Sequence, residues 1–402
     1  MIRKDDRLIV AAKYNIDSHV EQPLPLVSVV VPAYNSAAYI GATLHSLTVQ
    51  TYPYIEIIVV DDGSVDHTAQ IIESFMRTDD RIKLIQQPNS GVAVARNQGI
   101  QAASGQFVAP VDSDDICYPK KIEKLLACML SSSNDVGLVY GWSATIDHRG
   151  LLTGGYMAKQ AEDDVFGDLV YTNFIGNASA CLIRKDCLNL VGFYNPAYLE
   201  QKAQGCEDYD LYLRIAEHFK FRVVKDFLTG YRSTGKGMSF DYRAMEKSRR
   251  LVVQDLKLRN PWIPNIVFRW AHSSYCLWIA ARANYVGCFK DSIRYLLKAA
   301  QYDAALLTNS CYVYKQLSYA MRKTYGTPFR PFLSNCKARL SVPRSPDDGH
   351  AKDITLEKLI EQAYRLDPPS SLMLFRERRQ KAVRRIIRKA RNAIVIRQAF
   401  ET

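Results

Sequence analysis

Acidic residues follow hydrophobic runs in the first part of this 402-residue chain. The run 57–60 leads into Asp61 and Asp62, and the run 107–111 leads into a cluster that begins at Asp112. In a parallel α/β sheet the carboxyl ends of the strands meet at one edge, and ligands bind there. Carboxylates at that edge, without a glycine-rich phosphate loop, indicate a divalent cation that holds a phosphorylated ligand.

Hydrophobic runs and amphipathic segments alternate between residues 27 and 140, which predicts strands that alternate with helices. Such an alternation gives a mostly parallel sheet with helices on both faces. We therefore expect an α/β fold. The expected strands are 27–31, 55–61, 82–85, 106–111 and 136–140, followed by 177–184 and 221–225.

The pattern divides the chain into four parts. A polar lead-in, 1–24, precedes the α/β domain, 25–250, in which the segment 147–176 is irregular. Helical spacing dominates 251–340. We interpret this part as a helical appendage, because its one tetratricopeptide-like helix pair cannot bury its own apolar face. A linker and basic amphipathic helices fill 341–402.

The chain carries a formal net charge of +12, and cations concentrate in the segment from Arg376 to Arg397. Such a segment favours an anionic partner, for example a membrane surface. Its apolar residues at helical spacing are typical of a helix at a membrane interface, or equally of a helix that packs on its own domain.

Nine scattered cysteines without a paired motif indicate reduced thiols. The first twenty residues lack the apolar region of a signal peptide, and we find no apolar run long enough to span a membrane. We therefore expect a cytoplasmic protein that contacts the inner face of the membrane at most peripherally.

Five motifs, taken in order, resemble a family 2 glycosyltransferase of the GT-A fold. They occupy residues 27–35, 58–64, 91–99, 112–115 and 207–214. The resemblance implies a Rossmann-like sheet and the inverting transfer of a sugar from a nucleotide-diphosphate sugar, with a UDP-sugar as the expected donor. The acceptor would be a hydroxyl of a glycan or of a lipid-linked saccharide, as in cell-wall or polysaccharide biosynthesis.

The resemblance also implies a set of nucleotide-sugar-binding residues. The turn after the first strand would contact the nucleoside, Asp62 would bind the base, and Arg96 would reach the base or the diphosphate. Taken singly, these residues also fit a simple turn, a helix cap or a surface helix. The full set is Pro32, Ala33, Tyr34, Asn35, Asp61, Asp62, Arg96, Asp112 and Ser113.

The segment Asp112-Ser113-Asp114 matches the Asp-x-Asp motif of the resemblance. Alternate residues of an extended segment point to the same side, so both carboxylates can face one ligand. By resemblance Asp114 coordinates the cation, and Asp112 reaches the ribose or the cation. Hard carboxylate oxygens without His or Cys nearby favour Mg²⁺ or Mn²⁺, which would neutralise the leaving diphosphate. An isolated motif of this kind is more often a surface turn.

By the same resemblance Asp208 is the general base, which would take the proton of the acceptor hydroxyl. The adjacent Glu207 carries a like charge that raises the pKa of one member of the pair. Spacing alone also fits two carboxylates that stabilise the N-terminus of a helix.

The segment 231–239 resembles a flexible loop of the family, but it lacks the histidine that many relatives carry there. We expect Arg232 or Lys236 to contact phosphate instead. Trp142 and Tyr171 are candidates to stack on acceptor sugars, although aromatic side chains near strand ends more often belong to the core.

A catalytically silent GT-A module that acts as a scaffold or binding protein is the alternative. The joint presence of Asp62, Asp112, Asp114 and Asp208 disfavours it. A nucleic-acid-binding protein is disfavoured because aromatic residues do not interleave the basic tail. A dinucleotide dehydrogenase is disfavoured because no G-x-G-x-x-G motif follows the first strand. The sequence therefore predicts a metal-dependent glycosyltransferase.

Overall fold

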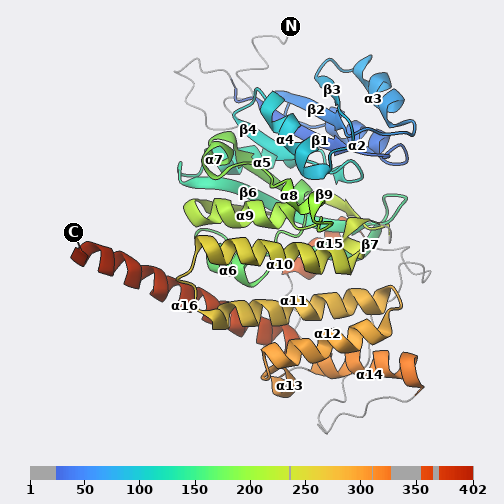
Figure 1. The fold of residues 1–402 in the computed structure, drawn as a ribbon. Coiled ribbons are helices and arrows are strands. Elements are labelled where there is room, and N and C mark those ends of the chain that lie inside the picture. The colour runs from blue at the N-terminus through green and yellow to red at the C-terminus, as the bar shows by residue number, and fades with distance from the viewer. Residues whose placement is uncertain (1–23, 235–236, 310, 327–354, 365–370, 402) are drawn as a thin grey trace.

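The computed structural model describes residues 24–234, 237–309, 311–326, 355–364 and 371–401. The predicted lead-in before Leu24, the linker around 341–349 and Lys236 lie outside these residues. Figure 1 shows a sheet domain followed by a layered set of helices, with the last helix crossing back toward the sheet domain.

A nine-stranded sheet forms the first domain, in the order β3-β2-β1-β4-β8-β6-β9-β5, with β7 paired to β6. The first four strands of this order are parallel to one another. Their carboxyl ends therefore share one edge, as the sequence predicts. The strands are β1 (Val27–Ala33), β2 (Ile55–Asp61), β3 (Ile82–Gln86), β4 (Phe107–Pro110), β5 (Ile116–Cys117), β6 (Val136–Ile146), β7 (Leu152–Met157), β8 (Cys181–Arg184) and β9 (Lys220–Arg232).

Helices cover both faces of the sheet, and the strands β1 and β2 are buried throughout. On β1, Val30 belongs to the core that also holds Ala95 of α4, whereas Val29 and Val31 belong to the core that holds Leu44 of α2. This two-sided burial explains the all-apolar strands and confirms the α/β fold. The helices are α2 (Ile40–Thr48), α3 (Thr68–Met76), α4 (Val92–Ala102), α5 (Lys121–Leu130), α6 (Phe166–Tyr171), α7 (Lys185–Val191), α8 (Ala197–Glu200) and α9 (Glu207–His218).

Three local predictions need correction. The segment 147–176, read as irregular, contains β7 and α6. The strand predicted over 177–184 begins as the short 3-10 helix η1 (Ala178–Ala180), and its strand part is antiparallel to its neighbours. The strand predicted over 221–225 is too short, because β9 runs from Lys220 to Arg232 and Gly230 still pairs with Ile116. Long-range strand pairing decided these cases, and local sequence does not encode it.

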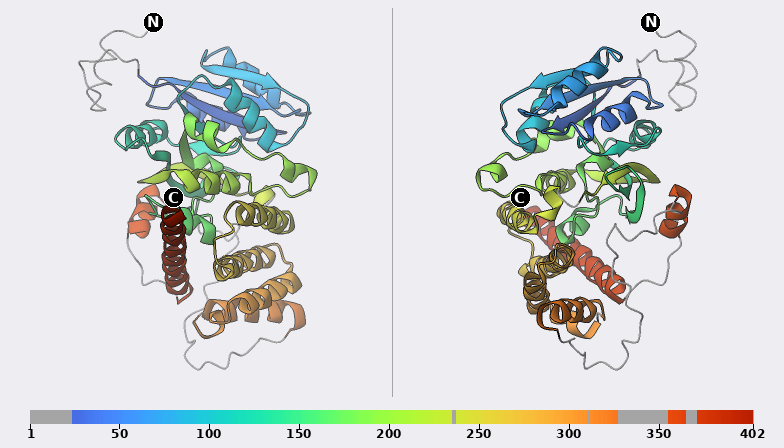
Figure 2. Two further views of the ribbon diagram at one scale, coloured as in Figure 1. Left: turned by 60° about the vertical axis from the view of Figure 1, so that its left-hand side comes forward. Right: turned by 90° about the vertical axis from the view of Figure 1, so that its right-hand side faces the viewer.

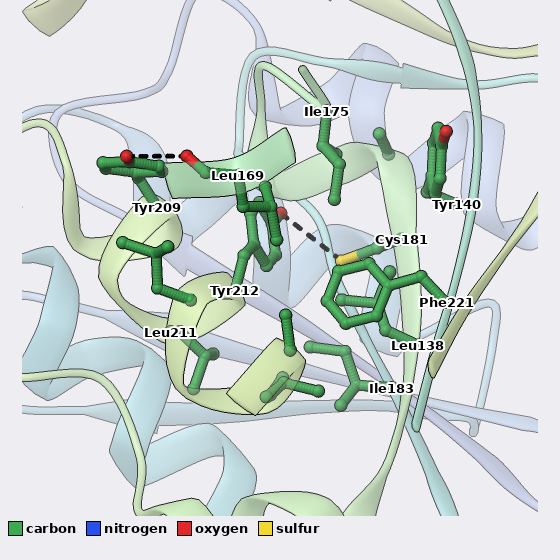
Figure 3. Close-up of a cluster of buried hydrophobic side chains, with 14 of the residues drawn as sticks. Leu138, Tyr140, Leu169, Ile175, Cys181, Ile183, Tyr209, Leu211, Tyr212 and Phe221 are labelled. Atoms are coloured by element: carbon green, nitrogen blue, oxygen red, sulfur yellow. Dashed lines mark hydrogen bonds between the residues drawn. The ribbon is translucent and has the colours of Figure 1, made fainter. Parts of the chain in front are cut away.

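Helix α9 is fixed at its first turns by hydrogen bonds from two tyrosines to neighbouring main chain. The Tyr209 hydroxyl donates to the carbonyl of Leu169 (2.8 Å), and the Tyr212 hydroxyl donates to that of Asn177 (3.0 Å). Figure 3 shows both rings within the buried cluster between α6 and the sheet. The residue that precedes Tyr209 is Asp208, so this anchoring holds the predicted base in place.

The second part of the chain is helical, and it packs against the sheet domain. The boundary expected at residue 250 falls inside α10, because that helix contacts both α9 and α11. A short 3-10 helix, η2 (Met238–Phe240), precedes α10. The helix pair α11 and α12 buries its apolar face against α14. The helices are α10 (Tyr242–Arg259), α11 (Asn265–Tyr285), α12 (Phe289–Tyr302), α13 (Leu306–Asn309), α14 (Cys311–Tyr325), α15 (Leu356–Tyr364) and α16 (Ser371–Glu401).

The basic helix α16 lies across α6 and the helical layers (Figure 2). Val383 and Ile387 are buried in the core of the sheet domain. The buried carboxylate of Asp168 accepts hydrogen bonds from Gln380 and from Arg384, the latter at 2.6 Å. The apolar stripe of this helix therefore packs on its own chain. Among the described helices, none has the length and apolar character that crossing a membrane requires.

We predict that Gly99→Ala destabilises the fold by about 1–3 kcal/mol, as overpacking does in other cores. A Cβ at this position of α4 would lie 2.4 Å from the Val30 Cγ1 atom of β1. The matched control is Gly41→Ala in α2, where the nearest atom would be 3.7 Å away, in ordinary contact. The control should raise stability by about 0.5–1 kcal/mol. Urea unfolding checks both, and equal effects would contradict the prediction.

Candidate active site

The first two turns at the carboxyl edge of the sheet are tied together. Asn35 adopts a left-handed conformation with φ of 48°. Its main-chain N–H donates to Ser64 Oγ (2.9 Å), and its side-chain oxygen accepts from Val65 N (2.9 Å). Asp61 Oδ1 accepts from Ser64 N (3.0 Å). The predicted nucleoside-binding turn therefore forms one ledge with the turn after β2. On it Tyr34 is exposed, and Pro32 and Ala33 are buried.

Asp62 is buried beside this ledge, and its carboxylate already accepts three hydrogen bonds. The donors are Gln87 Nε2 (2.7 Å), Ser90 N (2.8 Å) and Gly91 N (2.8 Å). The last two belong to the turn that starts α4. Asp62 thus holds the N-terminus of the helix that carries Arg96, a positioning task beyond the base contact implied by the resemblance.

The acidic cluster after β4 joins the ledge through serine. Ser113 Oγ lies 2.7 Å from Ser36 Oγ. Asp115 is fully buried, and it accepts from Ser179 Oγ (2.5 Å) and from Arg232 N (2.9 Å). The structure therefore makes Asp115 a link between β9 and η1, whereas Asp112 and Asp114 keep partial exposure at the sheet edge.

Arg96 joins the sheet edge to α9. Its guanidinium is buried and pairs with Asp112 Oδ1 at 2.5 Å. The same group lies 5.0 Å from the centre of the Tyr194 ring. The carboxylates of Glu207 and Asp208 also act on its charge. One cation from α4 thus stands among three carboxylates from two distant segments.

Asp208 lies at the first turn of α9, and its environment suits a proton acceptor. Its Oδ1 accepts from Tyr209 N (2.7 Å). Burial raises the pKa of Asp208 to about 6, Arg96 opposes that rise, and the charge of Glu207 adds to it. Burial also raises the pKa of Glu207, which accepts a hydrogen bond from Gly205 N (2.8 Å). Glu207 therefore stabilises the loop before α9 through this hydrogen bond. Asp208 is the group whose pKa lies close to neutral pH.

A cavity of about 610 Å³ opens beside these residues. Arg96, Asp112, Glu207 and Asp208 belong to its lining. Asp62, Asp114 and the 32–35 turn lie outside its lining. The structure thus brings together the predicted base and one member of the Asp-x-Asp motif in one cavity, and it leaves the predicted nucleoside contacts on the adjoining ledge.

The pair Asp112 and Asp114 fits a divalent cation. Burial raises the pKa of Asp114 to about 6, and the charge of Asp112 adds to that rise. The two carboxylates therefore carry more negative charge than the neighbouring cations neutralise. Both side chains offer only hard oxygen donors. Within the described residues, no three His, Cys, Asp or Glu side chains form a complete metal cage. A cation here would therefore share its coordination with oxygens of the ligand, as is usual for Mg²⁺.

Three further sequence predictions have mixed outcomes. Arg232 is buried and donates to the carbonyls of Asp114 (2.6 Å) and Asp147 (2.8 Å). It therefore stabilises the main chain of the acidic cluster after β4. Trp142 is fully buried in the core, which confirms the structural alternative. Tyr171 is also buried, and part of its surface lines the cavity.

The sequence does not predict the part of the cavity lining that the helical region supplies. Its residues are Arg249 of α10, Tyr275, Trp278 and Arg282 of α11, and Arg376 of α16. The spacing of Tyr275, Trp278 and Arg282 places them on one face of a helix, which was the available signal. The interpretation of this region as an appendage directed attention away from it.

Comparisons with known proteins agree with this site. The family model described as "Glycosyl transferase family 2" matches residues 28–184. Glycosyltransferase GlyG of Streptococcus pneumoniae is 43% identical over 112 residues, which are 28% of this chain and 37% of that protein. Chondroitin synthase of Pasteurella multocida is 27% identical over 250 residues, 62% of this chain and 25% of that protein. The chain thus spans less than half the length of these relatives.

Among solved structures, S. aureus TarS 1–349 aligns with a TM-score of 0.48 and 23% identity, over 74% of this chain and 87% of that one. The family match covers the strands β1 to β8, with the ledge and the Asp-x-Asp motif. The part of the chain that carries the ledge and the Asp-x-Asp motif, residues 28–184, is therefore similar to glycosyl transferase family 2.

Proposed function

We propose that the chain is an inverting glycosyltransferase that moves a sugar from a nucleotide-diphosphate sugar to a saccharide hydroxyl. The observation that carries this proposal is the placement of Asp208 and Asp112 in one cavity, joined through Arg96. A base on α9 thereby faces the edge of the sheet where the family match and the Asp-x-Asp motif lie. The silent-scaffold alternative gives no reason to gather three carboxylates around one buried arginine, since removing charges from water is costly.

In this proposal the donor nucleoside lies on the ledge formed by the 32–35 turn and the turn after β2, with a UDP-sugar as the expected donor. Asp61 and Asp62 hold that ledge and the start of α4 in place through the hydrogen bonds described above. Arg96 lies between the ledge and the cavity and can stabilise negative charge on the diphosphate. Asp112 and Asp114 would hold Mg²⁺ or Mn²⁺, which supplies charge neutralisation for the diphosphate when bound.

Asp208 would accept the proton of the acceptor hydroxyl as that oxygen attacks the anomeric carbon. The bond from that carbon to the diphosphate oxygen breaks in the same displacement, so the anomeric configuration inverts. Its pKa near 6 leaves the carboxylate ionised at neutral pH while making it more basic than an exposed aspartate.

We predict that Asp208→Asn lowers the transfer rate by about 10²–10⁴-fold, the usual contribution of a general base. Binding of the nucleotide sugar should remain within about twofold, because Asn keeps the shape of the side chain. Product formation and donor binding by calorimetry are the two measurements. The control is Asp186→Asn, an exposed carboxylate in the first turn of α7. Loss of donor binding together with transfer would argue against a base role.

We also predict an acidic limb in the pH profile of kcat/KM, with an apparent pKa near 6. Asp208 must be deprotonated to act, so activity is present above that pKa and falls about tenfold per pH unit below it. Protonation of Asp114, whose pKa is also raised to about 6, would weaken cation binding over the same range. Saturating Mn²⁺ should overcome the loss of cation binding at Asp114. The loss of activity that comes from protonation of Asp208 should remain. A flat profile between pH 5 and 7 would contradict the assignment of Asp208.

We further propose that the chain works in the cytoplasm at the inner face of an anionic membrane. The seven cysteines that the structure describes as free support a reducing compartment. On α16, Lys381, Arg385 and Arg388 are exposed on the side away from the core. Because Val383 and Ile387 are buried, the contact would be electrostatic, without insertion of the apolar stripe.

We predict that the full chain binds vesicles containing phosphatidylserine at low salt and does not bind neutral vesicles. Replacing Lys381, Arg385 and Arg388 by Gln should weaken binding by about 1 kcal/mol per removed cation. The control replaces the exposed Arg269, Lys290 and Arg294 of α11 and α12 by Gln, with the same change of net charge. Sedimentation with vesicles measures both. Equal binding by the two triple variants would rule out α16 as the contact.

A further inference from the structure

We propose that Arg249, Arg282 and Arg376, which the helical region contributes to the lining of the cavity, bind an anionic group of the acceptor saccharide. This inference rests on the proposed function, because it treats the cavity as the acceptor side of the transfer. The anionic group is a carboxylate of an acidic sugar or a phosphate of a phosphodiester-linked unit, since both match a guanidinium in shape and charge.

The three arginines lack carboxylate partners within the described part of the chain. None of them takes part in an ion pair, whereas their neighbour Arg379 pairs with Asp303 at 2.7 Å. The Nε atoms of Arg249 and Arg376 are buried without a hydrogen-bond partner among the described residues. Arg249 is only 4% exposed. Buried cations without counter-ions are costly, and a bound anion would offset that cost.

Aromatic rings hold these guanidinium groups in place. Arg249 lies 5.0 Å from the ring centre of Tyr209 and 4.5 Å from that of Tyr275. Arg282 lies 4.7 Å from the ring centre of Phe240 and 5.3 Å from that of Trp278. Cation–π contacts orient the charge without neutralising it. Burial lowers the pKa of Arg282, which agrees with a cation that still lacks a counter-ion.

The cavity lining thus carries charges of both signs. It includes Glu207 and Asp208 of α9 and the three arginines of α10, α11 and α16. An acceptor that placed a hydroxyl at Asp208 would lie in the same cavity as the arginines. A negative charge on it would be attracted by the arginines and repelled by the carboxylates, which favours one orientation of an anionic acceptor.

The test uses the full chain without donor and three probes. One probe is a tetrasaccharide that contains glucuronate, the second is the same tetrasaccharide with its carboxyl groups reduced to alcohols, and the third is a glycosylated polyol-phosphate oligomer. Calorimetry should show that at least one anionic probe binds about tenfold or more tightly than the reduced probe. Binding of one anionic probe and not the other distinguishes a carboxylate from a phosphate.

Arg282→Gln and Arg376→Gln should each lose most of that preference. Arg269→Gln, an exposed position on α11, should keep it. Arg282→Lys should retain part of it, which covers the case in which the Gln variant does not fold. Equal binding of the anionic and reduced probes, or a full preference in folded Arg282→Gln and Arg376→Gln variants, would overturn the inference. Because these measurements need no donor, failure of the transferase proposal would appear separately, as transfer that survives Asp208→Asn.

Discussion

The ion pair between Arg96 and Asp112 is the interaction on which the site depends. It joins helix α4 to the end of β4, and it is buried beside Glu207 and Asp208. Without the guanidinium, three carboxylates would stand close together with little water around them, and at least one would take up a proton. With it, the rise in the pKa of Asp208 is opposed, and that pKa stays at about 6. The architecture that delivers Arg96 therefore matters as much as the carboxylates themselves.

That architecture is built from local tasks at the carboxyl edge of the sheet. Asp62 fixes the start of α4, Gly99 lets the helix approach β1, and the Arg96 side chain then lies over the edge. Asp115 and Arg232 fasten the acidic cluster to β9 from the other side. Several residues that the sequence marks as ligand contacts thus also have structural tasks, which explains why both interpretations of each motif looked reasonable in isolation.

The parallel strands, the helices between them and the carboxylates at their ends could be predicted, because all follow from hydrophobic period and strand order. The base at Asp208 could be proposed only through family resemblance, since spacing alone fits a helix N-terminus equally well. The antiparallel insertion of β8 and the length of β9 could not be predicted, because they depend on pairing between distant segments. The same holds for Trp278 and Arg376, whose place at the cavity depends on how the helical layers dock.

Arg376 lies near the end of the chain and yet lines the same cavity as Arg96. During synthesis the sheet domain leaves the ribosome first and can begin to fold, so the carboxylates around Arg96 assemble well before α16 exists. A nascent or prematurely terminated polypeptide would therefore contain these carboxylates without the part of the cavity lining that α16 supplies. Synthesis of α16 becomes the step that finishes the cavity, and any deletion that removes this helix acts directly on it.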